Sequence, residues 1–170
     1  MAFSKVKKEL ESLNKAQIIT LIGELYKNNK ANKDFLDHFA NPDEKALLET
    51  FTIRIREIFF PSRGKIDLRK GRKALAEFKK LGTSAEKNVE LMFVYINTGL
   101  EAANKYWQLD DSYYNSMSSV FQEALKLLQK EDMLPEFEIR IKNFITNVDS
   151  WRLQDDFKYY FEKYYPEKKS

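Results

Sequence analysis

The sequence predicts an all-α protein. Apolar residues recur at spacings of three and four along nearly the whole chain, which is the period of an amphipathic helix, and we find no convincing strand pattern. Glycine and proline number only 5 and 4 among 170 residues, so residues that form turns are scarce. We therefore expect about seven or eight helices in antiparallel neighbours, arranged as an irregular bundle or as a short stack of helix pairs.

Three short helices are expected before residue 42. The first covers residues 3 to 12, and the second begins at Asn14, whose side chain caps the helix while Gln17 reaches back in a capping box. We expect the second helix to bury four aliphatic side chains, namely Ile18, Leu21, Ile22 and Leu25. The third covers residues 31 to 40 and carries Phe35, Leu36 and Phe39.

Two further helices are expected before residue 82. Asn41 followed by Pro42 predicts an N-cap with proline at the first helical position, and Pro61 ends that helix. The next helix ends at Gly82, a typical C-terminal cap. The apolar face of the first of these two helices comprises Leu47, Leu48, Phe51, Ile55, Ile58 and Phe59. That of the second comprises Leu68, Leu75, Phe78 and Leu81.

A central helix should follow, because residues 89–107 are apolar almost all round. Thr83 and Glu86 predict its capping box, and it ends near Trp107. Asp110 or Asp111 caps the next helix, Pro135 opens another, and a last one starts near residue 153. The inward residues of these three are Tyr114, Met117, Val120, Phe121, Leu125 and Leu128; Phe137, Ile141, Phe144, Ile145 and Val148; and Leu153, Phe157, Tyr160, Phe161 and Tyr164.

The composition indicates the cellular compartment and the number of domains. The chain has no cysteine, which excludes disulfides and thiol catalysis and fits a reducing cytoplasm. No window approaches 18 apolar residues, and the first 13 residues do not read as a signal peptide, so we expect a cytoplasmic protein without a membrane partner. Since the connections are short and no stretch resembles a linker, we expect one domain over residues 1–170.

Positive charge is concentrated in one stretch. Residues 59–82 hold eight Lys or Arg against two acids, an excess of six, whereas the whole chain has a formal charge of +3. Cations at a helix N-terminus oppose the helix dipole and so do not help the helix to form. A role other than helix stability would explain them, and contact with nucleic-acid phosphates is one interpretation. The other is a solvated face whose partners are acids elsewhere, the usual role of such runs. The candidate residues are Arg63, Lys65, Arg69, Lys70, Arg72 and Lys73.

A second candidate site is a small polar pocket of an enzyme. Polar residues interrupt the central helix and the start of the next one, and buried polar groups need hydrogen-bond partners. Satisfaction of helix ends is the simpler explanation. The residues are Asn97, Thr98 and Asn104 on the central helix, with Tyr114 and Asn115 on the next.

No catalytic, metal or cofactor motif is present. The five glycines form no phosphate-binding loop, and no nucleophile elbow occurs. His38, the single histidine, has only Asp34 as a neighbouring ligand on its helical face, which is too few for a metal site. We therefore expect no metal and no cofactor, and we lean against an enzyme. Three aromatic residues near the C-terminus, Trp151, Tyr159 and Tyr165, are left over from the apolar face. They could stack on bases, contact a partner helix or lie at a homodimer seam.

Several stretches together resemble a known family: KAQIITLIGELYKNN, DFLDHFANPDEKALLETF, IFFPSRGK, KKLG, LMFVYINTGLEAAN and DDSYYNSMSSVFQEAL. Over nearly the whole chain they resemble an uncharacterised all-helical bacterial family classed as a domain of unknown function. The resemblance implies a single helical domain in a bacterial cytoplasm and transfers no activity. We favour a noncatalytic protein that presents a helical surface to another protein or to itself. Nucleic-acid binding through residues 63–73 is the alternative, and an enzyme is third.

Overall fold

The computed structural model describes residues 3–106, 109–149 and 151–165, and gives no side chain for the first two residues of the last range. These residues form nine α-helices and no strand, which confirms the all-α class with one helix more than expected. Contacts along the chain divide it into two compact units, Met1–Asp43 and Glu44–Ser170, which we describe separately. That the chain is one folding domain stays a prediction.

The first unit contains three helices: α1 (Phe3–Glu11), α2 (Lys15–Asn28) and α3 (Lys30–Ala40). Helix α2 begins with the expected capping box, because Asn14 Oδ1 accepts from the Gln17 amide (3.0 Å) and Gln17 Oε1 accepts from the Asn14 amide (2.9 Å). A single residue, Asn29, connects α2 to α3 and caps α3 through the Asn32 amide (2.8 Å). Helices α2 and α3 pack as a hairpin.

The first unit has no core. None of the described residues 3–43 is buried, so the expectation that α2 buries its aliphatic side chains is wrong. Ile22 is 40% exposed and Leu25 is 41% exposed, and Phe39 on α3 is 76% exposed. The physical reason is that three short helices have too little volume to cover both sides of an apolar hairpin.

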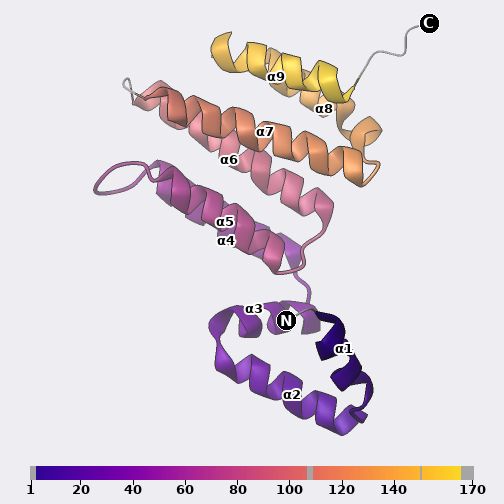
Figure 1. Cartoon of the computed structure of the whole chain (residues 1–170). Helices are drawn as coiled ribbons and strands as arrows, with labels where there is room; N and C mark the ends of the chain where they lie inside the picture. The colour runs from indigo at the N-terminus through magenta and orange to yellow at the C-terminus, as the bar shows by residue number, and fades with distance from the viewer. Residues whose placement is uncertain (1–2, 107–108, 150, 166–170) are drawn as a thin grey trace, which may run out of the picture. The chain divides into compact units, whose positions relative to one another are not determined.

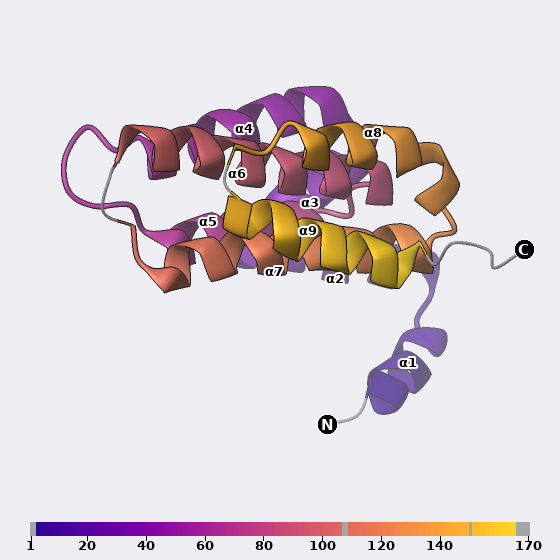
Figure 2. The ribbon, with the colours of Figure 1, turned by 90° about the horizontal axis from the view of Figure 1, so that it is seen from above.

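The second unit contains six helices: α4 (Glu44–Phe59), α5 (Leu68–Lys80), α6 (Ala85–Lys105), α7 (Asp111–Lys130), α8 (Leu134–Thr146) and α9 (Trp151–Tyr164). They form three successive hairpins, α4–α5, α6–α7 and α8–α9, and neighbouring hairpins pack on one another. Figure 2 shows α4, α6 and α8 in one layer and α5, α7 and α9 in the other. The arrangement is the short stack of helix pairs that the sequence allowed (Figure 1).

Helix boundaries agree with the sequence at most positions. Asp110 caps α7 and a proline opens α8, as expected. Gly82 follows α5 with φ 81°, in the left-handed region that glycine enters without strain. Two expectations are wrong: Asn41 ends α3 and does not cap α4, and the N-cap of α6 is Ser84. The expected end of the central helix near Trp107 lies outside the described residues, and α6 itself ends at Lys105.

The core of the second unit is centred on α6, which has ten buried residues. One aromatic cluster joins the α6–α7 hairpin to the α8–α9 hairpin. Between ring centroids, Phe121 on α7 lies 4.3 Å from Phe157 on α9, and Phe93 on α6 lies 5.1 Å from Phe144 on α8. Close approach of α6 and α7 depends on Gly99, where a Cβ would lie 2.3 Å from the sulfur of Met117. The stack is therefore held by large buried rings and tight helix contacts.

A helix that crosses a bilayer needs about 20 consecutive, mainly apolar residues. Among the described helices, none combines the length and the apolar character that a bilayer crossing requires.

Candidate functional site

The most distinctive surface is an apolar face on the α2–α3 hairpin, which we call the hairpin face. At about 100° per residue, the three exposed aliphatic positions of α2 lie within an arc of roughly 120°, and the two exposed phenylalanines of α3 lie one turn apart. The hairpin face consists of Ile19, Ile22, Leu25, Phe35 and Phe39, which are 61%, 40%, 41%, 42% and 76% exposed. Within each of the two helices, the exposed apolar side chains therefore lie on one side.

Polar contacts hold the hairpin together. The Tyr26 hydroxyl donates to Asp37 Oδ1 (2.9 Å), and this hydrogen bond raises the pKa of Tyr26. Asn32 Nδ2 donates to the Leu25 carbonyl (3.0 Å), and the Lys33 ammonium lies 5.8 Å from the Tyr26 ring centroid. These polar contacts join α2 to α3 within the hairpin.

The structure divides the six basic candidates into two groups. Three are exposed and have no carboxylate within ion-pair distance among the described residues: Arg63, Lys65 and Lys70. The other three have acidic partners: Arg69 with Asp67 (3.8 Å), Arg72 with Glu123, and Lys73 with Glu77 (3.7 Å). Lys79 and Lys80, at the end of α5, are also exposed. The unpaired charge thus lies in the loop before α5 and at both ends of that helix.

Arg72 has a structural position. It joins α5 to α7 through Glu123, and its Nη1 is buried without a hydrogen-bond partner. The neighbouring Gly71 lies against Tyr95, because a Cβ there would lie 2.6 Å from that ring. A side chain fixed between two helices is a poor phosphate ligand, so Arg72 belongs to the packing of α5 on α7.

The structure brings together only two of the five residues expected in a polar pocket. A hollow of about 140 Å³ is lined by Asn104 and Tyr114, with Leu100, Ala103, Asn147 and Asp149. Asn97 and Asn115 are exposed, and Thr98 is buried; none of them lines this hollow. Its volume is below the roughly 300 Å³ at which small-molecule sites usually begin.

A second hollow, more open, lies along the loop before α5. Its volume is about 390 Å³, and it is lined by five consecutive residues, Lys65 to Arg69. Two of them are basic, but Asp67 is among them and its carboxylate already accepts hydrogen bonds from the Arg69 and Lys70 amides. The anionic cap occupies the helix N-terminus that a phosphate would use.

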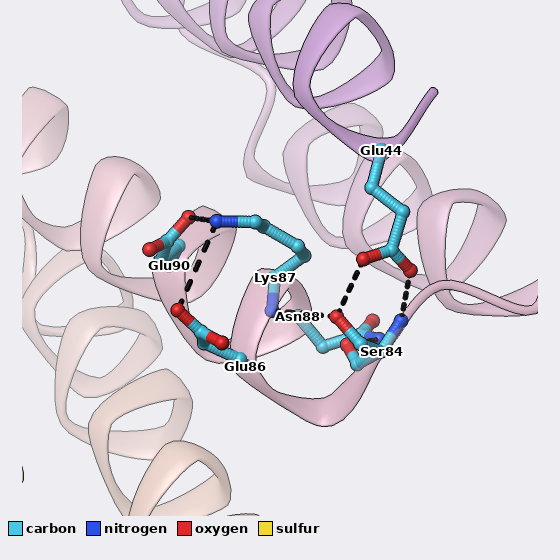
Figure 3. A network of polar contacts seen from close by, with 6 residues as sticks. All are labelled: Glu44, Ser84, Glu86, Lys87, Asn88 and Glu90. Carbon is cyan, nitrogen blue, oxygen red and sulfur yellow. Dashed lines mark hydrogen bonds and ion pairs between the residues drawn. The ribbon is translucent and has the colours of Figure 1, made fainter. Parts of the chain in front are cut away.

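Sequence reasoning missed a polar network that joins the starts of α4 and α6. Glu44 accepts from the backbone amide of Ser84 (2.5 Å) and from its hydroxyl (2.7 Å), as Figure 3 shows. Asn88 donates to the Ser84 carbonyl (2.7 Å), and Lys87 donates to Glu90 (2.9 Å), which raises the pKa of Lys87. Every member of this network serves a helix end or an ion pair, so it positions α4 on α6.

The remaining candidates from the sequence are the single histidine, His38, and the three aromatic residues near the C-terminus. The described part of the chain contains no group of three or more His, Asp or Glu that could hold a metal ion, and His38 is half-buried. Tyr159 is 60% exposed, whereas Tyr165 donates to the Leu134 carbonyl and stacks on Phe161 at 4.4 Å. The side chain of Trp151 lies outside the described residues. A homodimer through these aromatics stays a prediction.

The sequence did contain a signal for the hairpin face. Apolar residues occupy five positions of α2, which are Ile18, Ile19, Leu21, Ile22 and Leu25, and together they cover about half of the helix circumference. A single short neighbour, α3, can cover only part of that arc. Helix α2 therefore has more apolar positions than α3 alone can cover.

Comparison with protein families gives a match over nearly the whole chain. A family model described as a family of unknown function (DUF6155) matches residues 1–165. A search of curated proteins found no match. A search of solved structures found none.

Proposed function

The chain belongs to the DUF6155 family of unknown function, and we propose that it is a noncatalytic binding protein whose hairpin face docks a protein surface. The observation that carries this proposal is the contrast between the two units. Residues 3–43 contain no buried side chain, whereas every helix from α4 to α8 has buried residues. Helices of 14 and 11 residues are marginal alone in water, because most helix stability comes from packing of an apolar face.

The exposed apolar side chains of α2 and α3 support the same proposal. Monomeric proteins rarely expose contiguous apolar patches above a few hundred Å², and larger ones mark interaction sites. Phe39 and Phe35 project from one side of α3, and aromatic residues of this kind are enriched among residues that dominate interface energies. A protein surface is therefore the occupant that this face fits best.

A photo-crosslinking amino acid at position 39 tests the proposal in living cells. We expect a crosslinked product of discrete mass, because Phe39 is the most exposed side chain of the hairpin face. The same amino acid at position 139 is a matched control, since Ile139 on α8 is 75% exposed and Phe39 is 76% exposed. The product should disappear when Ile22→Glu is introduced on the same face. No product at position 39, or the same products at both positions, would contradict protein docking by the hairpin face.

Binding of a polyanion is a second candidate function, supported by the exposed unpaired cations before and within α5. We expect a triple variant, Arg63→Gln, Lys65→Gln and Lys70→Gln, to weaken binding of single-stranded RNA or duplex DNA at low salt. Each lost phosphate contact should also reduce the slope of the logarithm of affinity against the logarithm of salt concentration, by roughly 0.7 to 0.9. Fluorescence anisotropy at about 50 and 200 mM salt measures both quantities.

The control for this experiment removes the same charge elsewhere. Lys45, Lys126 and Lys158 are also exposed, and their replacement by glutamine leaves the net charge equal to that of the triple variant. If both triple variants weakened binding equally, the attraction would come from net charge alone. Absence of binding by the unmodified protein at low salt would reject this second function outright.

A further inference from the structure

We propose that the polyanion bound by the basic residues before and within α5 is single-stranded nucleic acid, and that Phe60 and Tyr106 stack on its bases. This inference rests on the second candidate function, since it names the class of polyanion and adds the end of α6 to the site. Proteins that bind single strands without sequence preference combine cations that follow the phosphates with aromatic side chains on which bases stack. Both kinds of side chain occur together at one end of the second unit.

Three side chains from two hairpins meet at this end, and we call Phe60, Lys105 and Tyr106 the ring cluster. The rings of Phe60, which follows α4, and Tyr106, the C-cap of α6, lie 6.3 Å apart between centroids. The Lys105 ammonium lies 5.4 Å from the Phe60 centroid and 5.6 Å from the Tyr106 centroid. Both rings are half-buried, so each keeps part of its surface in solvent. Figures 1 and 2 show the α4–α5 loop and the end of α6 at the same end of the second unit.

Lys105 supplies a positive charge that no carboxylate pairs with in the part of the chain that the structure describes. Its side chain is exposed, and an ammonium that contacts rings on one side keeps N–H donors for a phosphate on the other. The neighbouring Arg56 differs, because Glu101 lies 3.1 Å from its guanidinium. We therefore expect Lys105 to move from the rings to a phosphate when a base takes its place.

The α4–α5 loop places further cations within reach of the ring cluster. Arg63 and Lys65 follow Phe60 by three and five residues, so they lie at most about 11 and 18 Å from it along the chain. Two acids at the same end are engaged elsewhere, because Asp67 caps α5 and Asp110 caps α7. A short length of strand can thus contact cations of the loop and of α6 together.

The rings favour a single strand over a duplex. Bases of a duplex stack on one another inside the double helix, whereas the unpaired bases of a single strand can turn outward onto aromatic side chains. A duplex would contact the cations at this end and leave the rings unused. The presence of two partly exposed rings beside unpaired cations is therefore the observation that selects a single strand.

The stacking contact is tested by fluorescence anisotropy of the full chain with three labelled probes. They are an oligothymidylate, an abasic strand with the same phosphates, and a duplex of the same length. We expect Tyr106→Ala to weaken oligothymidylate binding by about 5- to 150-fold, as loss of one stacked base does. The factor should be the same at about 50 and 200 mM salt, because stacking releases no counterions. Binding of the abasic strand and of the duplex should not respond to this substitution.

The charge contact is tested separately. Lys105→Gln should reduce the slope of the logarithm of oligothymidylate affinity against the logarithm of salt concentration by roughly 0.7, the effect of one phosphate contact. Lys126→Gln, which removes an exposed lysine of α7, is the matched control and should leave the slope unchanged. Tyr159→Ala is the control for Tyr106→Ala, since it removes a ring that is 60% exposed on α9. Circular dichroism checks that each variant keeps its helices.

The outcomes separate this inference from the second candidate function. If Arg63→Gln, Lys65→Gln and Lys70→Gln together weaken binding and Tyr106→Ala does not, polyanion binding stands and base stacking is wrong. Equal affinity for the abasic strand and the oligothymidylate would overturn the inference in the same way. A duplex that binds more tightly than the single strand would assign the cations to duplex phosphates. Absence of binding by the unmodified protein at low salt would reject both proposals.

Discussion

Replacement of Phe121 by alanine is expected to lower the free energy of unfolding by about 3 to 5 kcal/mol. The Phe121 ring is fully buried, and its neighbours come from three other helices: Phe93 on α6, Phe144 on α8 and Phe157 on α9. Truncation removes the transfer free energy of the ring and leaves a cavity that these rings cannot all collapse into. Because domains are stable by only about 5 to 15 kcal/mol, the loss should be plain in urea unfolding followed by circular dichroism.

The control for this prediction is an aromatic residue of the same unit that lies in solvent. Tyr159→Ala on α9 removes a ring that is 60% exposed, and surface substitutions of this kind usually change stability by about 0.5 kcal/mol or less. If both substitutions cost the same, Phe121 would not lie at the junction of the helix hairpins. A loss below about 1 kcal/mol for Phe121→Ala would contradict the packing described here in the same way.

Local features of the fold could be predicted because they depend on a few adjacent residues. Three helix starts lie where the sequence predicted them. Side chains of Asn14, Gln17 and Asp110 accept hydrogen bonds from backbone amides that the helix leaves unpaired, and Pro135 has no amide hydrogen to leave unpaired. The apolar period likewise identified Phe121 and Leu125 as core residues of α7. Helix type and position follow from such short-range rules.

Contacts between distant residues could not be predicted in the same way. Thr83 with Glu86 fits the pattern of a capping box and Ser84 with Lys87 does not, yet Ser84 is the N-cap of α6. The backbone amide of Ser84 donates to Glu44, which lies 40 residues away in the sequence. Arg72 looks like its basic neighbours in the sequence, yet it pairs with Glu123 across 51 residues. Which cation faces solvent is decided by helix packing, and a single sequence does not specify that packing.

The hairpin face shows a different limit. Periodicity identified Ile22 and Leu25 as apolar positions of a helix, and the inference that they are buried assumed a neighbour within the same unit. Periodicity states that a face needs a cover and says nothing about which chain supplies it. The same residues that were wrong as core positions are therefore the strongest candidates for an interface.

Alkaline conditions should destabilise the second unit steeply, starting near pH 10. Burial is the main cause that raises the pKa of Tyr95 and the pKa of Tyr113 in the folded protein, and the hydrogen bond of Tyr95 to Ser116 only partly opposes it. In the unfolded chain both phenols ionise near pH 10. Their contribution to stability is thus complete below pH 10 and is lost as the pH rises from there toward the folded pKa. Each tyrosine should contribute a slope of up to about 1.4 kcal/mol per pH unit, or roughly 3 for the pair.

Urea unfolding at several pH values between about 8 and 11.5 measures this slope, and ultraviolet absorbance of the phenolate follows the ionisation itself. Tyr95→Phe should reduce the slope of the free energy of unfolding against pH by up to about 1.4 kcal/mol per pH unit, the contribution of one proton. It should also lower stability at neutral pH by about 1 kcal/mol, because the 2.8 Å hydrogen bond to Ser116 is lost. Tyr159→Phe should change neither quantity, since that ring is 60% exposed.

The hydroxyl of Tyr113 on α7 donates to the Gly99 carbonyl on α6 at 2.6 Å. Its ionisation would place a buried negative charge against a carbonyl oxygen, so alkaline unfolding should begin at this contact. An alkaline slope that did not differ between Tyr95→Phe and the unmodified protein would show that the two buried phenols do not govern the transition.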